Sequence, residues 1–165
     1  MMEDGGAGFS IRTYQAEDRE EVVALWKISF AGDPPRNEPS LVIDRKLLEN
    51  DELFFVGVSS GSVVGTVLAG FDGVRGWAYH LAVAPELRRR GLAGALMDHA
   101  EAMLLSRGCP KLNLQVRTSN AEVVAFYESR GYAIDQVISL GKVLGDEPVP
   151  ALDGYRPPSG RAQEF

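Results

Sequence analysis

Residues 81–96 read LAVAPELRRRGLAGAL, and within this stretch a strand pattern changes to a helix pattern. Pro85 ends the strand because proline has no backbone N–H to donate to a sheet. From Gly91 onward the apolar residues recur at the spacing of one buried helix face. The members of this apolar stripe are Leu92, Leu96, Ala100, Met103 and Leu104. We therefore expect a strand, a tight turn and a helix, with arginines and small residues where the helix begins.

The turn between this strand and helix has the composition of an anion-binding site. Small residues let a ligand approach the backbone, and the free N–H groups and positive dipole end of a helix favour a phosphate. Gly94 supports this interpretation, because a glycine inside a helix costs about 1 kcal/mol and needs a compensating role. The alternative is an ordinary strand-to-helix turn with exposed arginines. The sequence has no G-x-x-x-x-G-K-[ST] loop and no G-x-G-x-x-G motif after a strand, which argues against a nucleotide-binding regulatory domain.

Upstream of this stretch, strand and helix patterns alternate. We expect a strand over residues 9–14, a helix from residue 17 that ends before Gly32, and a second helix over 40–50. Residues that favour strands then dominate 53–58, 62–68 and 76–83, with Ser60-Gly61 as a hairpin turn.

Downstream, the same alternation continues. We expect a strand over 111–117, a short helix that begins with a capping box at 119–122, and one or two closing strands within 131–144. Hairpins first and a strand–helix–strand crossover later predict an α/β (α+β) fold, a mixed sheet with helices on both faces.

Composition indicates one globular domain, since 45% of the 165 residues are apolar and 24% are charged. We place this domain at 9–144, between a disordered tail over 1–8 and a proline-containing tail over 145–165. The net charge of −6 argues against nucleic-acid binding. A lone cysteine, Cys109, excludes an intrachain disulfide and a multi-cysteine zinc site. Because no secretory signal and no membrane-spanning apolar run is present, we expect a cytoplasmic protein without a membrane partner.

A second motif lies further along the chain. Asn120 and Tyr127 are about two helical turns apart, so both can line one wall of a cleft. Taken alone, the pair Phe126-Tyr127 is more typical of core packing.

The two motifs together resemble a known family. Arg88-x-x-Gly91-x-Ala93 matches the R/Q-x-x-G-x-G/A signature of the GNAT superfamily of N-acetyltransferases, and the other two family markers occur at family spacing. They are Leu81-Ala82-Val83 before the signature and Asn120, Phe126, Tyr127, Gly131 and Tyr132 after it. The chain resembles this superfamily over about residues 9–144, and within it a small bacterial branch of uncertain substrate.

The resemblance implies a twisted mixed sheet of about six to seven strands with helices on both faces. Its two central parallel strands, here 77–83 and 112–117, splay apart and leave a V-shaped cleft for acetyl-CoA. Backbone groups of Leu81 and Val83 would pair with the pantetheine arm, Asn120 would hydrogen-bond it, and Tyr127 would lie near the sulfur. Backbone N–H groups of the turn would hold the pyrophosphate. The implied cofactor-binding residues are Leu81, Ala82, Val83, Arg88, Arg89, Arg90, Gly91, Leu92, Ala93, Gly94, Asn120, Phe126 and Tyr127.

The implied reaction is acetyl transfer from acetyl-CoA to a primary amine of a small molecule or protein, without a metal, by a monomer or homodimer. A backbone N–H near residues 81–83 can polarise the thioester carbonyl. Tyr127 can donate a proton to the departing thiolate, since a free thiol has a pKa near 8.5. Residues about 25–45 shape the acceptor pocket in the family, and the negative net charge mildly favours a cationic amine. The alternative is a non-catalytic acyl-CoA-binding module.

The general base is the open point of this hypothesis, because Trp77 and Gln115 stand where family members often carry glutamate. Tyr79, His80 and an ordered water are the candidates. Strand alternation puts Tyr79 and His80 on opposite faces, which favours water and makes His80 a packed strand histidine. His99 is expected to be structural or on the surface. Cys109 is expected to act as a small apolar filler.

Overall fold

The computed structural model describes residues 8–145. Its centre is a five-stranded sheet in the order β1-β2-β3-β4-β5. Neighbouring strands are antiparallel from β1 to β4, whereas β4 and β5 are parallel. The strands are β1 (Ser10–Thr13), β2 (Phe54–Ser59), β3 (Ser62–Phe71), β4 (Gly76–Val83) and β5 (Leu112–Asn113).

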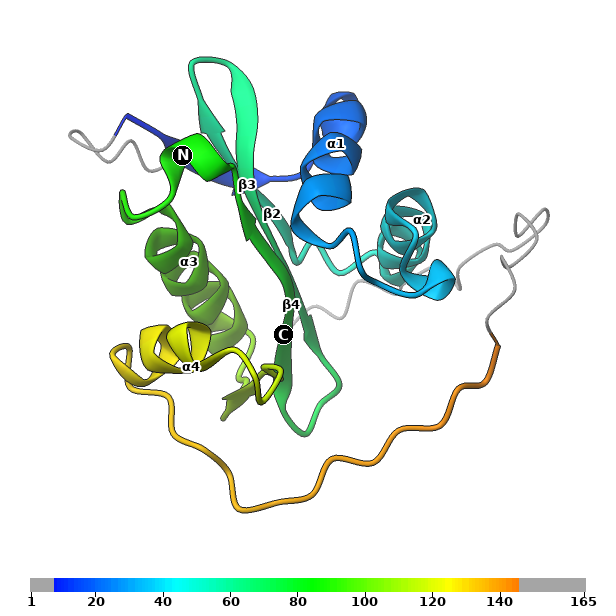
Figure 1. Cartoon of the computed structure of the whole chain (residues 1–165), viewed down its shortest axis with the longest axis vertical. Coiled ribbons are helices and arrows are strands. Elements are labelled where there is room, and N and C mark those ends of the chain that lie inside the picture. Colours follow the sequence, from blue (N-terminus) through cyan, green and yellow to red (C-terminus); the bar gives the residue numbers. More distant parts are fainter. Residues whose placement is uncertain (1–7, 146–165) are drawn as a thin grey trace.

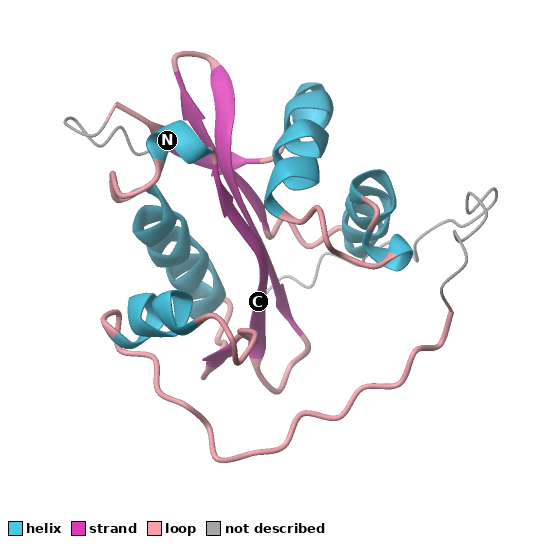
Figure 2. Ribbon diagram, viewed as in Figure 1, coloured by secondary structure: helices cyan, strands magenta, loops and turns pink. Residues whose placement is uncertain are grey.

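Helices cover both faces of this sheet, as the sequence predicts (Figure 1). Figure 2 shows helices on both sides of the strands. The α-helices are α1 (Arg19–Ser29), α2 (Pro39–Glu49), α3 (Leu92–Ser106) and α4 (Ala121–Glu128). The mixed α/β architecture expected from the sequence is therefore confirmed, with fewer strands than the family resemblance implies.

The core lies in two layers, one on each face of the sheet. On the α1 face, the indole ring of Trp26 stacks on Phe54 with ring centroids 5.7 Å apart. On the α3 face, Leu92 packs tightly against the sheet, because a Cβ added at Gly57 would lie 2.7 Å from its Cδ1. Each such fully buried side chain contributes about 1.5–3 kcal/mol of hydrophobic stabilisation. This close packing fixes the beginning of α3 against the central strands.

Helix boundaries agree with the sequence patterns to within about two residues. The capping box expected at 119–122 is wrong in detail. Asn120 is the N-cap of α4, and its Oδ1 accepts a hydrogen bond from Val123 N at 3.3 Å. Glu122 forms an ion pair with Arg89 instead of returning to the cap. The cap therefore begins one residue later than the box requires.

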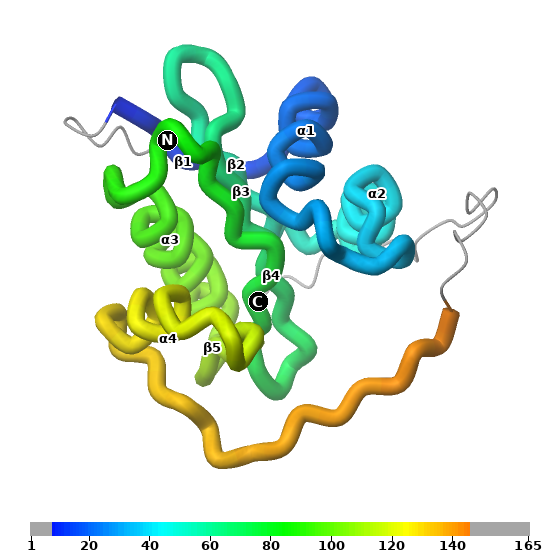
Figure 3. Tube along the Cα trace, in the orientation of Figure 1, coloured from blue at the N-terminus to red at the C-terminus, as the bar shows by residue number. Residues whose placement is uncertain are grey.

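The expected closing strands are the main error in the fold prediction. After α4 the chain runs as an extended segment around the outside of the fold (Figure 3). The expected strand over 111–117 is reduced to Leu112–Asn113, so β5 has too short an edge to extend the sheet. Side chains make the contacts here: Asn113 Nδ2 donates to Asp135 at 2.9 Å, and Gln115 Nε2 donates to Ser139 at 2.5 Å.

The domain limits and tails expected from the sequence stay predictions, because nearly all of both tails lies outside residues 8–145. Within those described residues, none of the helices combines the length and apolar character needed to cross a bilayer.

Candidate functional site

The turn between β4 and α3 has an open helix N-terminus. Gly91 is the N-cap of α3 with φ 86°, a left-handed conformation that favours glycine. Its side-chain position meets no described atom within 4 Å, and no side chain of the described chain caps the helix here. The first N–H groups of α3 are consequently available to an anion. Arg88, Arg89 and Arg90 are all exposed beside them.

Gly94 has a packing role that the sequence did not indicate. A Cβ at this position would lie 2.7 Å from Nη1 of Arg130, whose Nη2 donates to the carbonyl oxygen of Gly94 at 3.1 Å. Arg130 also pairs with Asp98, one helical turn after Gly94, and lies over the ring of Phe126. The small residue in the first turn of α3 therefore lets α4 dock there. The spacing of Gly94 and Asp98 on one helix face was the available signal for this contact.

Tyr127 lies on the buried side of α4. Its ring packs against Phe126 and Tyr132, with centroid distances of 5.0 and 5.4 Å. Burial raises the pKa of Tyr127 to about 12, so its hydroxyl stays protonated at neutral pH. Asn120 is exposed at the start of the same helix. The structure thus brings the second predicted motif next to α3, where Arg130 connects the two helices.

The two parallel strands, which the family resemblance expects to splay apart, pair at their beginning only. Their ladder holds the pairs Gly76–Leu112 and Trp77–Asn113, and no later pair within the part of the chain that the structure describes. Beyond this point β4 continues to Val83, paired with β3 alone. Val83 O accepts a hydrogen bond from Arg88 Nε at 3.3 Å. The backbone edge of Leu81–Val83 therefore faces the gap in the ladder.

The predicted cofactor-binding residues differ in whether their side chains are buried or exposed. Ala82 and Leu92 are buried in the core, so only their backbone groups can contact a ligand. Ala93 is half-buried on α3. This distribution agrees with a site that is built mainly from backbone atoms.

A β-bulge at His80 overturns the expected strand alternation. The β3–β4 register passes from Leu68–Tyr79 to Thr66–Ala82, so two residues of β4 lie opposite one of β3. His80 has φ 51°, and its ring packs on Trp26 and Phe30 of the α1 face at 4.6 and 4.9 Å. The prediction that Tyr79 and His80 occupy opposite faces is therefore wrong.

Tyr79 lies on the same face as His80. Its cross-strand partner Leu68 lies two residues from Thr66 in β3, and Thr66 contacts Trp26 on the α1 face. Tyr79 is half exposed and stacks on Trp77 at 6.3 Å. Trp77, Tyr79 and His80 thus gather on the α1 face, because the bulge breaks the period of two that ordinary strands follow.

A buried hydrogen-bond chain holds this bulge. Trp26 Nε1 donates to Thr66 Oγ1 at 2.8 Å, and Thr66 Oγ1 donates to the carbonyl oxygen of His80 at 2.9 Å. Thr66 is completely buried. Burial also lowers the pKa of His80; Asp33 opposes this shift, and Arg45 adds to it. The imidazole is therefore neutral at pH 7 and can accept a proton.

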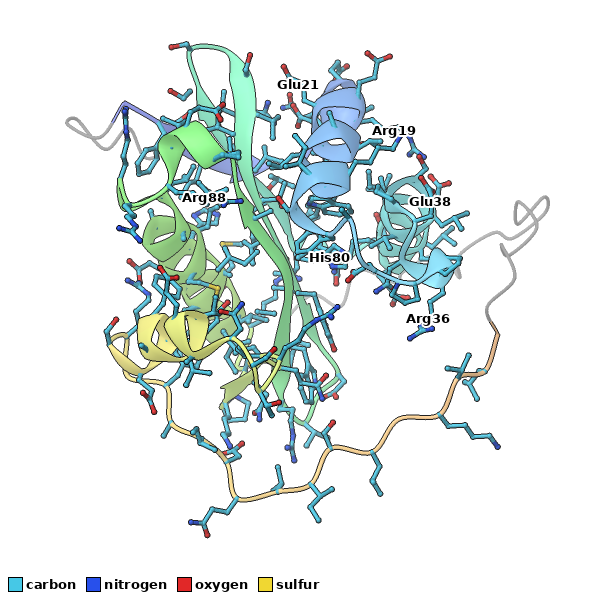
Figure 4. The ribbon with its side chains drawn as sticks, viewed as in Figure 1. Arg19, Glu21, Arg36, Glu38, His80 and Arg88 are labelled. Atoms are coloured by element: carbon cyan, nitrogen blue, oxygen red, sulfur yellow. The ribbon has the colours of Figure 1, made fainter. Side chains whose placement is uncertain are left out.

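A pocket of about 370 Å³ lies beside His80. Its other walls come from α1 and from the connection to α2, within the region where the family resemblance places the acceptor. The lining includes Trp26, Lys27, Phe30, Asp33, Pro34, Asn37, Glu38 and His80. The volume suits a small molecule or a single side chain. Figure 4 shows His80 and Arg88 on opposite sides of β4.

The remaining singled-out residues have structural positions. His99 packs edge-on against Phe55 at 4.6 Å, and Cys109 is buried beneath Gly76, as expected of packing residues. Across residues 8–145, no group of three or more His, Cys, Asp or Glu side chains is arranged to hold a metal ion.

Known proteins resemble this chain in sequence and in fold. A model of the acetyltransferase (GNAT) family matches residues 12–132. Acetyltransferase YE1169 of Yersinia enterocolitica serotype O:8 is 46% identical over 134 residues, which cover 81% of this chain and 94% of that relative.

Two solved structures extend the comparison. Ard1 from Thermoplasma volcanium has a TM-score of 0.68 and 27% identity, over 78% of this chain and 84% of that one. AAC(6')-Iy, solved with the bisubstrate analogue CoA-S-monomethyl-acetylneamine, shares the fold at a TM-score of 0.66 and 18% identity, over 82% of this chain and 98% of that one.

Proposed function

The chain belongs to the GNAT family of acetyltransferases, and from this premise we propose that it transfers the acetyl group of acetyl-CoA to a primary amine. The observation that carries the proposal is the position of two sites on opposite sides of β4 (Figure 4). One is the open N-terminus of α3, and the other is the pocket beside His80. This arrangement lets donor and acceptor approach the parted strands from different sides. The acceptor is a small molecule or a protein amine.

The donor side fits the chemistry of coenzyme A. Backbone N–H groups from Leu92 to Gly94 suit its pyrophosphate, with exposed arginines close by. The edge at Leu81–Val83, which β5 does not cover, suits its pantetheine arm, and Asn120, Phe126 and Tyr127 belong to the neighbouring helix and its N-cap. AAC(6')-Iy, which shares this fold, was solved with a CoA-containing analogue, and this supports coenzyme A as a ligand of the fold.

The acceptor side supplies the proton acceptor that the missing glutamates leave open. Neutral His80 takes the proton that the amine nitrogen loses as its bond to the acetyl carbon forms. The bulge removes the reason for preferring water, since His80 lines the pocket.

Acetyl-CoA supplies a thioester, whose carbon–sulfur bond breaks with its electron pair on sulfur. Tyr127 then donates a hydrogen bond and a proton toward this sulfur, and solvent restores the tyrosine proton. A backbone N–H near Leu81–Val83 stabilises the oxyanion. The products are the N-acetylated amine and the free thiol.

An acceptor screen that follows thiol release from acetyl-CoA, run beside a calorimetric titration of acetyl-CoA, tests this function. We expect binding together with amine-dependent thiol release. The absence of glutamate at Trp77 and Gln115 favours a second candidate, an acyl-CoA-binding module without turnover. Tight binding with no thiol release across the panel would support that module and contradict catalysis.

A further inference from the structure

The pocket beside His80 is divided into an apolar part and a polar part. Next to the strand, His80 is surrounded by the rings of Trp26 and Phe30. The connection between α1 and α2 contributes Asp33 and Glu38 to the same pocket. A ligand that fills it therefore meets a neutral base, then aromatic walls, then two carboxylates.

The carboxylate of Asp33 has capacity for a further hydrogen-bond donor. Its Oδ2 accepts from Asn37 Nδ2 and its Oδ1 from Arg117 Nη2, each at 3.2 Å, the long end of the normal range. An ionised carboxylate has about four acceptor positions. The Asp33 side chain is 21% exposed, so a charged ligand gains from pairing with it.

Arg117 forms only a weak ion pair with this carboxylate. Its side chain is 76% exposed, and ion pairs with such exposure are largely screened by water. A ligand ammonium that enters from the pocket can displace the guanidinium into solvent. Arg117 comes from the chain after β5, so its contact with Asp33 also links the two sides of the site.

The other charged groups near the pocket favour the same orientation of a ligand. Glu38 caps α2 by accepting from Leu41 N at 3.1 Å, and it adds a second negative charge beside Asp33. Lys27 is exposed, so its ammonium group can stay in water. Burial is the largest influence on His80 and disfavours a cation at that end, while Asp33 and Arg45 act on the imidazole in opposite directions. The pocket therefore suits a ligand that places a neutral amine at His80 and a cation at Asp33.

We propose that the acceptor is a short aliphatic diamine, with its reacting amine at His80 and its second, protonated amine bound by Asp33. The methylene chain between the two nitrogens lies along Trp26 and Phe30. This assignment rests on the proposed function for its reacting end. The charge selection at Asp33 is independent of turnover and is therefore measurable by binding alone.

Calorimetric titrations with three ligands of matched length test the proposal: 1,4-diaminobutane, 1-aminobutane and 4-aminobutanoate. We expect the diamine to bind at least about tenfold more tightly than the monoamine, because it gains one charge-assisted contact. The carboxylate-bearing ligand should bind most weakly. Asp33→Asn should remove the preference for the diamine. Asp44→Asn, which removes an equal charge on α2 outside the pocket lining, should keep the preference.

Equal binding of diamine and monoamine by the unaltered protein would overturn the proposal, and so would a preference that survives Asp33→Asn. Arg117→Gln is a second variant that leaves the pocket walls intact. It should tighten diamine binding about twofold or more, since a competing cation is gone. Weaker diamine binding by this variant would contradict the displacement of Arg117.

Thiol release separates this proposal from the proposed function. Acetylation of monoamines and diamines with equal efficiency would overturn selection at Asp33 and leave acetyl transfer supported. Preferential diamine binding without thiol release from acetyl-CoA would support selection at Asp33 and contradict acetyl transfer.

Discussion

The turn before α3 and the pocket beside His80 lie on opposite sides of one strand, yet they are built differently. The turn offers backbone N–H groups of consecutive residues, so its properties follow from small residues and a helix start. The pocket combines side chains from α1, from the connection to α2 and from the bulge in β4. Its shape depends on packing between distant segments.

The two regions therefore tolerate different substitutions. A backbone site is insensitive to most side-chain changes but fails when a side chain blocks the backbone. In a site built from side chains, each substitution removes the contribution of one residue and leaves the others in place.

Gly91→Glu should abolish measurable acetyl-CoA binding. The new side chain would project from a left-handed residue into the space in front of the helix N-terminus and would repel phosphate. Each lost hydrogen bond to a charged group costs about 1.5–3 kcal/mol, so affinity should fall about 100-fold or more. Calorimetry measures this directly.

Gly61→Glu is the matched control, because Gly61 also has a positive φ of 81° and open space at its side-chain position. It lies in the β2–β3 turn and shares the backbone strain, but it should leave acetyl-CoA affinity unchanged. Equal affinity of Gly91→Glu and the unaltered protein would remove the turn from the donor site.

The contrast also explains how much could be predicted from the sequence. The strands and helices from β1 to α3 follow local periodicity, and the turn at Gly91 is a contiguous motif, so both were accessible. The bulge at His80 was not, because Thr66 and Trp26 hold it from distant segments. The closing strands failed for a similar reason: pairing depends on the length of β5, which the alternation of residues 111–117 does not reveal.

Tyr127→Phe should lower kcat about 100-fold, as expected when a positioned proton donor is removed. The ring and its contacts with Phe126 and Tyr132 are retained, so stability and acetyl-CoA affinity should change little. Single-turnover kinetics isolates the chemical step. Tyr132→Phe is the control, since that hydroxyl donates to Glu101 at 2.6 Å and should affect stability instead. An unchanged chemical rate in Tyr127→Phe would leave core packing as the role of this residue.

His80→Gln should lower kcat/KM about ten- to a hundredfold, less than the loss at Tyr127 because water can partly replace the base. Burial lowers the pKa of His80 below its ordinary 6.5. Only the neutral imidazole accepts a proton and only the free amine attacks, so kcat/KM should rise steeply with pH up to a bend below 6.5 and less steeply above it. Without His80 the bend should vanish, and kcat/KM should follow the free-amine fraction alone, since the pKa of an aliphatic amine is near 10.4. His99→Gln is the control, because it alters a histidine outside the pocket lining and should keep the bend. A bend that persists in the pH profile of His80→Gln would exclude His80 as the base.

Thr66→Val should give the smallest effect on activity and a clear loss of stability. Valine keeps the volume of threonine but leaves Trp26 Nε1 and the carbonyl of His80 without their buried partner. An unsatisfied buried polar group costs about 1–3 kcal/mol, which urea denaturation measures as a lower midpoint. Because the bulge is then held less firmly, kcat/KM should fall about fivefold through loss of orientation. The bend in the pH profile should remain, since His80 itself is intact.

Thr13→Val is the control, because Thr13 lies at the exposed end of β1 and the substitution changes the same atoms without this contact. It should leave both the urea midpoint and kcat/KM unchanged. If Thr66→Val matched that control, the bulge would be held by the sheet register alone, and the pocket side would depend less on distant side chains than we infer.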